Sequence, residues 1–402
     1  MTRYLTAHRR ILAVVAAVAV LAALLVSLLT RAQGTPAAAP QTSAPVRLEV
    51  HGRTDIAAYV PRIKHVFVIN IENEDESNTW GDKSKAPYLA KTLRAKGVLL
   101  NNYYGTAHNS EPNYVAQISG QGPDPSMQAD CQTFSDFQAV GTTSLQQEQG
   151  VLGCVFPKSV KTIADQLDAK HKTWRGYMES MTTPCEHPAL GSVDTTQKAT
   201  KTSQYATRHD PFMYFHSIID RPAYCQSHVV GLGKLRQDLR SVRTTRNLTY
   251  ITPDLCDDGH DSTCADGVRK GGLAQVNTFM KTWVPRILGS PAYKRNGMLI
   301  ITSDESDGPQ SDSTSCCGET ATNTPMAGIS GPGGGQVGAL VLSKYTTGGT
   351  WSTTPYNHYA LLASIEEIFR LPKLGYAGAP SLDRFGLDVY NDGWWRTPPA
   401  KS

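Results

Sequence analysis

The run VFVINI, from Val66 to Ile71, decides the fold class, because it is short, mostly apolar and rich in β-branched residues. A run of this kind predicts a strand that is buried on both faces, which is typical of a parallel sheet. Further runs along the chain have the same character, and they predict strands at residues 98–104, 173–178, 248–252, 298–302 and 337–342.

Segments with helical spacing alternate with these strands. Leu273, Val276 and Met280, for example, fall on one face of a helix between two predicted strands. Similar apolar spacing predicts helices at residues 87–96, 160–170 and 359–371. Strands that alternate with helices predict an α/β fold, with a mostly parallel sheet flanked by helices on both faces. A stretch rich in Gly, Ser and Thr at residues 308–335 is expected to be a long irregular insertion.

The charge of the 402-residue chain disfavours one class of partner. The formal net charge is +4, and the arginines of the first 31 residues, Arg3, Arg9, Arg10 and Arg31, account for all of it. A protein that binds nucleic acid through phosphate contacts normally has a clear basic excess. Because the remainder of this chain is neutral, we expect no nucleic-acid partner.

The first 31 residues are predicted to be an export or anchoring segment. Arg9 and Arg10 precede an apolar run, residues 11–30, which is long enough to cross a bilayer as a helix. The positive flank predicts that the rest of the chain lies outside the cytoplasm, whether the segment stays as an anchor or is cleaved as a signal peptide. We expect a signal segment at 1–31, an Ala/Pro-rich linker at 32–61, a globular domain at 62–392 and a C-terminal tail at 393–402.

All eight cysteines lie in the globular part, and an even number suits disulfides formed outside the cytoplasm. The pair Cys256–Cys264 can close a small loop, and the pair Cys131–Cys154 flanks an irregular polar segment. Cys316 and Cys317 are adjacent, and since neighbours rarely bond to each other, each is expected to have a distant partner. A zinc knuckle is the alternative, although no Cys-x-x-Cys pair supports it.

Polar residues follow the predicted strands at the points where the strands end. Ligands of open α/β sheets bind beyond these carboxyl ends, so the residues are candidates for a functional site. They are Glu72 and Asn73, the loop 105–110 with His108 and Ser110, the group Asp254, Asp257, Asp258, His260 and Asp261, and the group Asp304, Glu305 and Asp307. Carboxylates at the ends of apolar strands are costly to bury unpaired, so the pattern predicts a divalent cation with oxygen ligands.

Each of these residues also has an ordinary structural interpretation. A strand-end acid is often a solvated loop residue, and Ser110 before Glu111 and Pro112 resembles a common helix N-cap. Alternatively, a serine at a helix N-terminus can be a nucleophile, because the dipole and the free N–H groups bind the phosphate that it attacks.

Sequence blocks in a fixed order point to a known family. The blocks are HVFVINIENEDESNTWG at 65–81, YYGTAHNSEPNYVAQISG at 103–120, ITPDLCDDGHD at 251–261, ITSDES at 301–306 and YNHYALLASIEEIFRLPKLGYA at 356–377. Together they resemble the bacterial phosphoesterase family of secreted acid phosphatases and phospholipases C, within the alkaline-phosphatase superfamily. The most similar subgroup is the actinobacterial acid phosphatases and phosphoinositide phosphatases. The resemblance implies an alkaline-phosphatase-like sheet and a catalytic domain at 62–392.

The resemblance also implies roles for individual residues. Ser110 is the nucleophile, and His260 binds phosphate or protonates the leaving alkoxide, with His108 as the second candidate. The implied ligands of a divalent metal cation are Glu72, Asn73, Ser110, Asp304 and Glu305. Further residues in register with the family's motifs are Asp258, His358 and Asn113. Each histidine could instead be a structural cap or loop residue.

The resemblance implies a metal-dependent phosphoesterase outside the cytoplasm, most closely an acid phosphatase that hydrolyses phosphate monoesters through a phosphoserine intermediate. Phosphoinositides and other phospholipids are candidate substrates, and the membrane is a partner if the anchor is retained. One alternative is a phosphodiesterase of the phospholipase C type. Another is a non-catalytic surface protein that kept the fold.

The chain departs from the family at several positions. Glu74, Asp75 and Glu76 replace the usual His/Arg, Ser/Thr and Phe, which adds negative charge beside the site. Asn109 replaces the usual Pro before the nucleophile, and Ser303 replaces the usual Trp before Asp304. These changes are expected to affect the metal, the tolerated substrate charge and the shape of the pocket.

Overall fold

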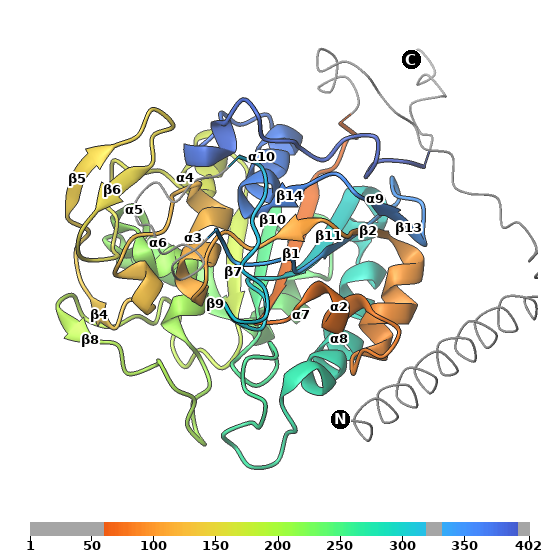
Figure 1. The fold of residues 1–402 in the computed structure, drawn as a ribbon, viewed down its shortest axis with the longest axis horizontal. Helices are drawn as coiled ribbons and strands as arrows, with labels where there is room; N and C mark the ends of the chain where they lie inside the picture. Colours follow the sequence, from red (N-terminus) through yellow and green to blue (C-terminus); the bar gives the residue numbers. More distant parts are fainter. Residues whose placement is uncertain (1–59, 319–331, 393–402) are drawn as a thin grey trace, which may run out of the picture. The chain divides into compact units, whose positions relative to one another are not determined.

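The computed structural model describes residues 60–318 and 332–392. Its centre is an eight-stranded sheet in which β7, β10, β1, β11 and β2 follow one another across the picture (Figure 1). The full order is β13-β2-β12-β11-β1-β10-β7-β9. The strands are β1 His65–Ile71, β2 Val98–Leu100, β7 Trp174–Met178, β9 Val229–Gly231, β10 Leu248–Thr252, β11 Gly297–Ser303, β12 Ala339–Ser343 and β13 Thr350–Ser352.

Most neighbouring strands of this sheet are parallel. β1 pairs in parallel with β10 and β11, β7 pairs in parallel with β10 and β9, and β13 pairs in parallel with β2. Only β12 runs antiparallel to its neighbours in the sheet, β11 and β2. The predicted mostly parallel α/β sheet is therefore confirmed.

The two faces of the sheet carry separate apolar clusters, because successive side chains of a strand point to opposite faces. On β1, Val66 and Val68 belong to the cluster that includes α3, α4 and α10. Phe67 and Ile69 belong to the cluster that includes α8. The helices are α2 Glu76–Trp80, α3 Ser110–Ser119, α4 Ile163–Ala169, α5 His216–Ile219, α6 Pro222–His228, α7 Leu235–Asp238, α8 Gly272–Gly289, α9 Pro291–Asn296 and α10 His358–Phe369.

Several predicted elements differ from the observed ones in detail. The helix expected at 87–96 is a π-helical turn, Tyr88–Leu93, followed by a 3-10 turn, Arg94–Lys96. The strand expected at 98–104 is split into β2 and a short strand β3, Tyr103–Tyr104, which pairs with β14, Tyr356–Asn357. Two further small pairings, β4 Thr133–Phe134 with β8 Ser192–Val193 and β5 Ala139–Thr142 with β6 Glu148–Gly150, were not expected.

The cysteines of the globular part are all paired. The predicted pairs Cys131–Cys154 and Cys256–Cys264 are confirmed, and Cys185–Cys225 is a further pair. The expectation of distant partners for the adjacent cysteines is wrong, because Cys316 and Cys317 bond to each other. Since no cysteine is free, the zinc-knuckle alternative is wrong as well.

The predicted signal segment at 1–31, nearly all of the linker and the tail at 393–402 lie outside the described residues. Within the described ranges, every helix is too short or too polar to span a bilayer.

Candidate active site

The carboxyl ends of three neighbouring strands, β10, β1 and β11, bring predicted site residues together. The N–H of Asp304, after β11, donates to the carbonyl of Ile71 at the end of β1 over 3.0 Å. The N–H of Glu72 donates to the carbonyl of Asp258, in the loop after β10, over 2.9 Å. The predicted convergence of strand ends is confirmed for these residues.

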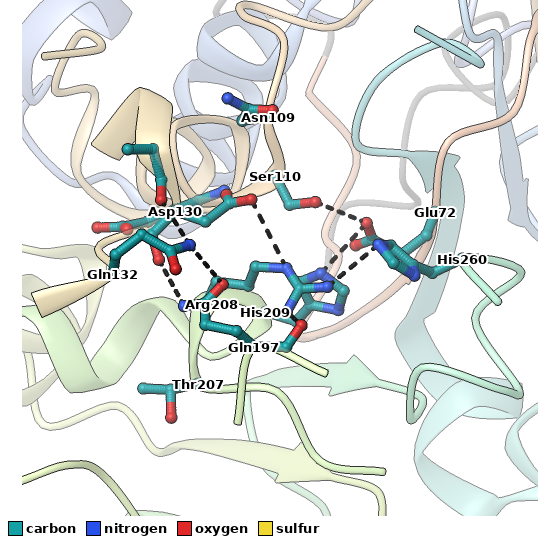
Figure 2. A network of polar contacts seen from close by, with 12 residues as sticks. Glu72, Asn109, Ser110, Asp130, Gln132, Gln197, Thr207, Arg208, His209 and His260 are labelled. Atoms are coloured by element: carbon teal, nitrogen blue, oxygen red, sulfur yellow. Dashed lines mark hydrogen bonds and ion pairs between the residues drawn. The ribbon is translucent and has the colours of Figure 1, made fainter. Parts of the chain in front are cut away.

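Ser110 is the first residue of α3, and its side chain points to the end of β1 (Figure 2). Its Oγ donates a hydrogen bond of 2.9 Å to Oε2 of Glu72, and both residues are buried. The N-cap of the helix is Asn109, not Ser110. The interpretation of Ser110 as an ordinary cap is therefore wrong, because its hydroxyl donates to Glu72 at the end of β1.

The N–H groups at the start of α3 are not free to bind phosphate. Asp130 accepts a hydrogen bond of 3.0 Å from the N–H of Glu111, and its carboxylate also accepts from the backbone of Ser110. This carboxylate occupies the positive end of the helix dipole. The expectation that the helix N-terminus holds phosphate is wrong for this reason.

Glu72 is the centre of the buried polar cluster. Besides Ser110, it accepts a hydrogen bond from the hydroxyl of Tyr114, and its carboxyl lies beside that of Asp304. Burial, followed by the charges of Asp304 and Asp258, raises the pKa of Glu72 well above its ordinary value. Three carboxyl groups in a buried space favour either protonation or a cation between them.

His209 completes this cluster, and the sequence analysis missed it. Its Nε2 lies 3.3 Å from Oε2 of Glu72, and its Nδ1 lies 3.2 Å from Oδ2 of Asp258. Burial, together with the charges of Arg208 and His260, lowers the pKa of His209 well below its ordinary value, which favours the neutral ring. Glu72, His209 and Asp258 form a group with spacing suited to a metal ion.

Arg208 was also missed, and it brings a buried guanidinium to the site (Figure 2). Its Nη2 lies 3.1 Å from Nε2 of His260, its Nη1 donates to the carbonyl of Gln197 over 3.0 Å, and its Nε lies 3.8 Å from Asp130. Nδ1 of His260 lies 2.8 Å from Asp261, which leaves Nε2 to accept from the arginine. Arg208 therefore brings the N–H donors of a guanidinium to the site, with His260 beside it.

Arg208 and His209 lie in a 3-10 turn, Thr207–His209, which is far in sequence from the end of any predicted strand. The signal that could have found them is the run Thr207 to Asp210, in which four consecutive polar residues precede the apolar Pro211 to Phe215. All four residues are buried, and this burial cannot be predicted from the positions of the strand ends.

His108 and Glu305 form a buried ion pair beside the nucleophile loop. Nδ1 of His108 contacts Oε2 of Glu305, and Nε2 donates to the carbonyl of Asp312 over 2.9 Å. Burial opposes the charged ring, but the hydrogen bond and charge of Glu305 raise the pKa of His108. Glu305 also accepts from the N–H of Asn109 over 3.2 Å. These contacts indicate that His108 and Glu305 stabilise the loop before Ser110.

Asn113 and His358 hold the backbone of the site. Oδ1 of Asn113 accepts from the N–H groups of Thr106 and Ala107 over 2.8 and 3.1 Å, and its Nδ2 donates to the carbonyl of Asn109 over 2.9 Å. Nε2 of His358 donates to the carbonyl of Asp304 over 2.6 Å, and burial lowers the pKa of this histidine to about 4. Neither side chain is therefore directed at a reacting group.

Several buried oxygen atoms at the strand ends lack partners among the described residues, and two of them belong to predicted metal ligands. These two are Oδ1 of Asn73 and Oδ2 of Asp304. Orphaned buried oxygens are rare in proteins and indicate a missing partner. Together with Glu72 and the hydroxyl of Ser110 they are an oxygen donor set that fits a divalent cation. Glu305, by contrast, has His108 as its partner.

Of the three acidic residues that follow Asn73, two make hydrogen bonds to other parts of the chain. The carboxylate of Asp75 accepts from the N–H of Asp307 and from Ser311, and Glu76 accepts from Asn101. Only Glu74 lines a cavity beside the site, and burial, followed by the charges of Asp307 and Asp75, raises its pKa to about 8.

The geometry agrees with what comparisons with known proteins show. The chain is similar to an acid phosphatase of Aspergillus fumigatus (23% identity; 77% of this chain and 55% of the relative). It is also similar to a phosphatidylinositol-3-phosphatase of Mycobacterium tuberculosis (24% identity; 84% of this chain and 86% of the relative). The match to the first of these spans little more than half of that relative's length.

Among solved structures, the fold is similar to that of a protein in the alkaline phosphatase superfamily from Vibrio parahaemolyticus. That similarity has a TM-score of 0.46 and 12% identity, over 78% of this chain and 68% of the other. The sequence pattern of the Phosphoesterase family matches residues 80–372, which is most of the chain. The chain belongs to the Phosphoesterase family.

Proposed function

We propose that this protein is a metal-dependent phosphoric ester hydrolase of the acid phosphatase type, which cleaves phosphate monoesters through a phosphoserine intermediate. The observation that carries the proposal is the hydrogen bond from Ser110 to Glu72, beside the orphaned oxygens of Asn73 and Asp304. Family membership and the acid phosphatase relatives support the same reaction class.

Ser110 attacks the phosphorus atom of the ester. A bond forms between its Oγ and phosphorus, and the bond from phosphorus to the alcohol oxygen breaks. The hydroxyl proton faces Oε2 of Glu72, which is its nearest acceptor. Water then cleaves the phosphoserine bond and restores the serine.

Glu72, Asn73, Asp304 and the hydroxyl of Ser110 would hold a divalent cation, which would supply Lewis acidity that favours deprotonation of the serine and offsets phosphoryl charge. Glu305 is not part of this proposed ligand set, because its contacts are with His108 and Asn109. The group of Glu72, His209 and Asp258 offers an adjacent set of donors.

Arg208 and His260 bind the phosphoryl oxygens from the side of the 3-10 turn. A planar guanidinium suits two oxygens at once, and His260 is the group that meets the leaving alkoxide. His108 and His358 take positioning roles instead, because Nε2 of each donates to a backbone carbonyl, of Asp312 and Asp304 respectively.

We further propose that the protein acts outside the cytoplasm. Its eight cysteines form four disulfides, a pattern that persists in oxidising compartments. A retained N-terminal anchor would place the enzyme close to lipid phosphates.

The test compares Ser110→Ala with the control Ser119→Ala. Ser119 is a buried serine of the same helix, and its hydroxyl makes hydrogen bonds to the backbone of the helix and of the segment just after it. We expect Ser110→Ala to lose turnover of p-nitrophenyl phosphate by at least about 1,000-fold, while Ser119→Ala keeps it. Acid-quenched wild-type enzyme should yield a phosphorylated peptide that contains Ser110, and elemental analysis should find metal that Asp304→Asn loses. Normal turnover by Ser110→Ala would overturn the proposal, and faster cleavage of bis(p-nitrophenyl) phosphate would replace it by the phosphodiesterase alternative.

A further inference from the structure

Glu111, the residue after the proposed nucleophile, carries a buried carboxylate that the proposed reaction does not use. Its side chain is inaccessible to solvent, and neither of its carboxylate oxygens has a hydrogen-bond partner among the described residues. Only the backbone N–H of Glu111 is engaged in the capping of α3 by Asp130. A buried carboxylate without a partner is costly, so these two oxygens indicate that Glu111 has a binding partner.

Two further buried side chains near Glu111 have the same property. Asp124 lies in the loop after α3, and its Oδ1 accepts from two backbone N–H groups over 2.7 and 3.1 Å. Its Oδ2 has no partner within the described part of the chain. Tyr214 ends the 3-10 turn Pro211–Tyr214, and its buried hydroxyl lacks a partner there as well. The orphaned oxygens therefore come from three separate segments of the chain.

Electrostatic interactions and packing relate these three groups to one another. Among the neighbouring charges, that of Asp124 acts most strongly on Glu111, and that of Glu111 acts most strongly on the hydroxyl of Tyr214. α3 also packs directly against the turn that ends at Tyr214. In spite of this, the orphaned oxygens make no hydrogen bonds to one another. A proton could pair two of these groups and leave the third unpaired, whereas one cation can contact all of them.

The donor atoms favour a hard cation over a soft one. A carboxylate oxygen of Glu111 lies within 4.8 Å of Sγ of Cys131 and Sγ of Cys154, but these two sulfur atoms are bonded to each other. Since a disulfide offers no thiolate, the available donors are the oxygens of Glu111, Asp124 and Tyr214. Ca²⁺ binds oxygen ligands, accepts a carboxylate through both of its oxygens, and completes its shell with carbonyls and water. The two carboxylates also balance the charge of one Ca²⁺.

This group is separate from the ligands at the strand ends. Figure 2 shows Asp130 and Glu72 on opposite sides of Ser110, and the N–H of Glu111 donates to Asp130. The charges that act most strongly on Glu72 are those of the strand-end carboxylates, whereas Asp124 and Asp130 act on Glu111. A cation at Glu111 would therefore be a different ion from the one proposed for the reaction.

We propose that Glu111, Asp124 and the hydroxyl of Tyr214 form a second cation site, which takes Ca²⁺ and has a structural role. The ion joins the start of α3 to the loop after that helix and to the turn Pro211–Tyr214. The first of these segments carries Ser110, and the last follows directly after the turn that carries His209. The bound ion thus holds together two segments that supply site residues. The inference does not depend on the proposed reaction.

Calorimetric titration with Ca²⁺ tests the site, using the full chain after treatment with a chelator. The titrations are made in Asp304→Asn, which removes a ligand of the strand-end cation. We expect this protein to bind about one Ca²⁺ per chain, and Ca²⁺ to raise its melting temperature by about 5 °C. Adding Glu111→Gln preserves the size of the side chain and removes its charge. It should weaken Ca²⁺ binding by at least about 100-fold and abolish the thermal shift.

The matched control is Glu366→Gln in the same background. Glu366 is also buried and has an orphaned Oε2, but the ammonium group of Lys373 lies 3.9 Å from that oxygen. This control should leave Ca²⁺ binding unchanged. Tyr214→Phe keeps the aromatic ring and removes one donor, so it should weaken Ca²⁺ binding by about tenfold. This variant tests the site even if Glu111→Gln does not fold.

Three results would overturn the proposal. Unchanged Ca²⁺ affinity in Glu111→Gln or in Tyr214→Phe would assign the ion to other residues. Failure of Asp304→Asn to bind Ca²⁺ would show that Glu111 is buried as a protonated carboxyl instead. Binding of Mg²⁺ in preference to Ca²⁺ would contradict the assigned ion. None of these results bears on Ser110, whose role is tested by turnover of the wild-type enzyme.

Discussion

The ring of His209 stacks on the ring of Tyr114, with centroids 5.2 Å apart and planes inclined by 7°. Both side chains also contact the carboxylate of Glu72, one through Nε2 and the other through its hydroxyl. The stack therefore fixes the direction of the acceptor that faces Ser110.

Replacing His209 by Gln should lower kcat of the phosphatase reaction by about 10- to 100-fold, because groups that orient a metal-binding carboxylate contribute this much. Bound metal, measured by elemental analysis, should fall as well. Tyr114→Phe keeps the stacked ring and removes only the hydroxyl, so its loss should be smaller. Equal activity of His209→Gln and wild-type enzyme would exclude His209 from the site.

The backbone conformation of Asn109 leads us to expect that substitutions at this position change the free energy of unfolding. Its φ of 71° and ψ of 146° lie in a region that glycine adopts far more readily than other residues. Asn109→Gly should raise the free energy of unfolding by about 1 kcal/mol, as measured by urea denaturation. Asn109→Pro introduces the residue that the family usually has at this position. It should destabilise the fold, because proline requires a φ near −65°. A stable proline variant would show that this backbone is free to change.

Asn113 predicts a coupled loss of stability and rate. It makes hydrogen bonds to Thr106, Ala107 and Asn109, and the truncation Asn113→Ala leaves those buried groups unpaired. We expect the free energy of unfolding to drop by about 2–4 kcal/mol and kcat to fall at temperatures where the variant is folded. Since Asn113 touches no reacting group, KM should change little, and a rise in KM alone would contradict this role.

The carboxyl of Asp210 predicts a pH dependence of stability. Burial raises its pKa to about 8, although Tyr205 and the N–H of Phe212 donate hydrogen bonds to it. The folded state thus favours the protonated form, and this contribution is complete below the unfolded pKa near 4 and is lost as pH rises toward 8.

Asp210→Asn imitates the protonated carboxyl at every pH. Its free energy of unfolding should match that of wild-type protein near pH 4 and exceed it by a few kcal/mol at pH 8. Denaturant titrations across this range test the difference. Asp220→Asn is the control of opposite sign, because His216 and Lys158 lower the pKa of Asp220. A constant difference between Asp210→Asn and wild type would rule out a raised pKa.

Arg208 predicts a change in anion affinity. Arg208→Lys keeps the charge but removes the planar fork, so the inhibition constant of inorganic phosphate should rise by about tenfold. Arg175→Lys is the matched buried control, since that guanidinium is bound to Asp238 and Ser227. It should alter stability without altering the inhibition constant. The same inhibition constant in Arg208→Lys and wild type would remove Arg208 from phosphate binding.

The periodicity of the sequence was sufficient to predict the sheet and the sheet edge at which the candidate site lies. Runs such as Val66 to Ile71 are apolar on both faces, and this property marks central parallel strands before any tertiary contact is known. Glu72 and Asp304 follow from the same reasoning, because the carboxyl ends of neighbouring parallel strands share one edge.

Residues outside the strand ends could not be found in this way. His209 and Arg208 reach the cluster from a 3-10 turn whose burial depends on tertiary packing. The capping of α3 by Asp130 comes from 19 residues further along the chain, and no local spacing rule reports it. The bond between Cys316 and Cys317 contradicted a general preference, since the local backbone brings the two sulfur atoms together.

The disulfide between Cys256 and Cys264 encloses the stretch that carries Asp258 and His260. A newly made chain with reduced thiols has no such clasp, and these two side chains are then tethered only by hydrogen bonds and packing. Under the proposed function, the reduced protein would therefore hold Asp258 and His260 in place less firmly than the oxidised protein does.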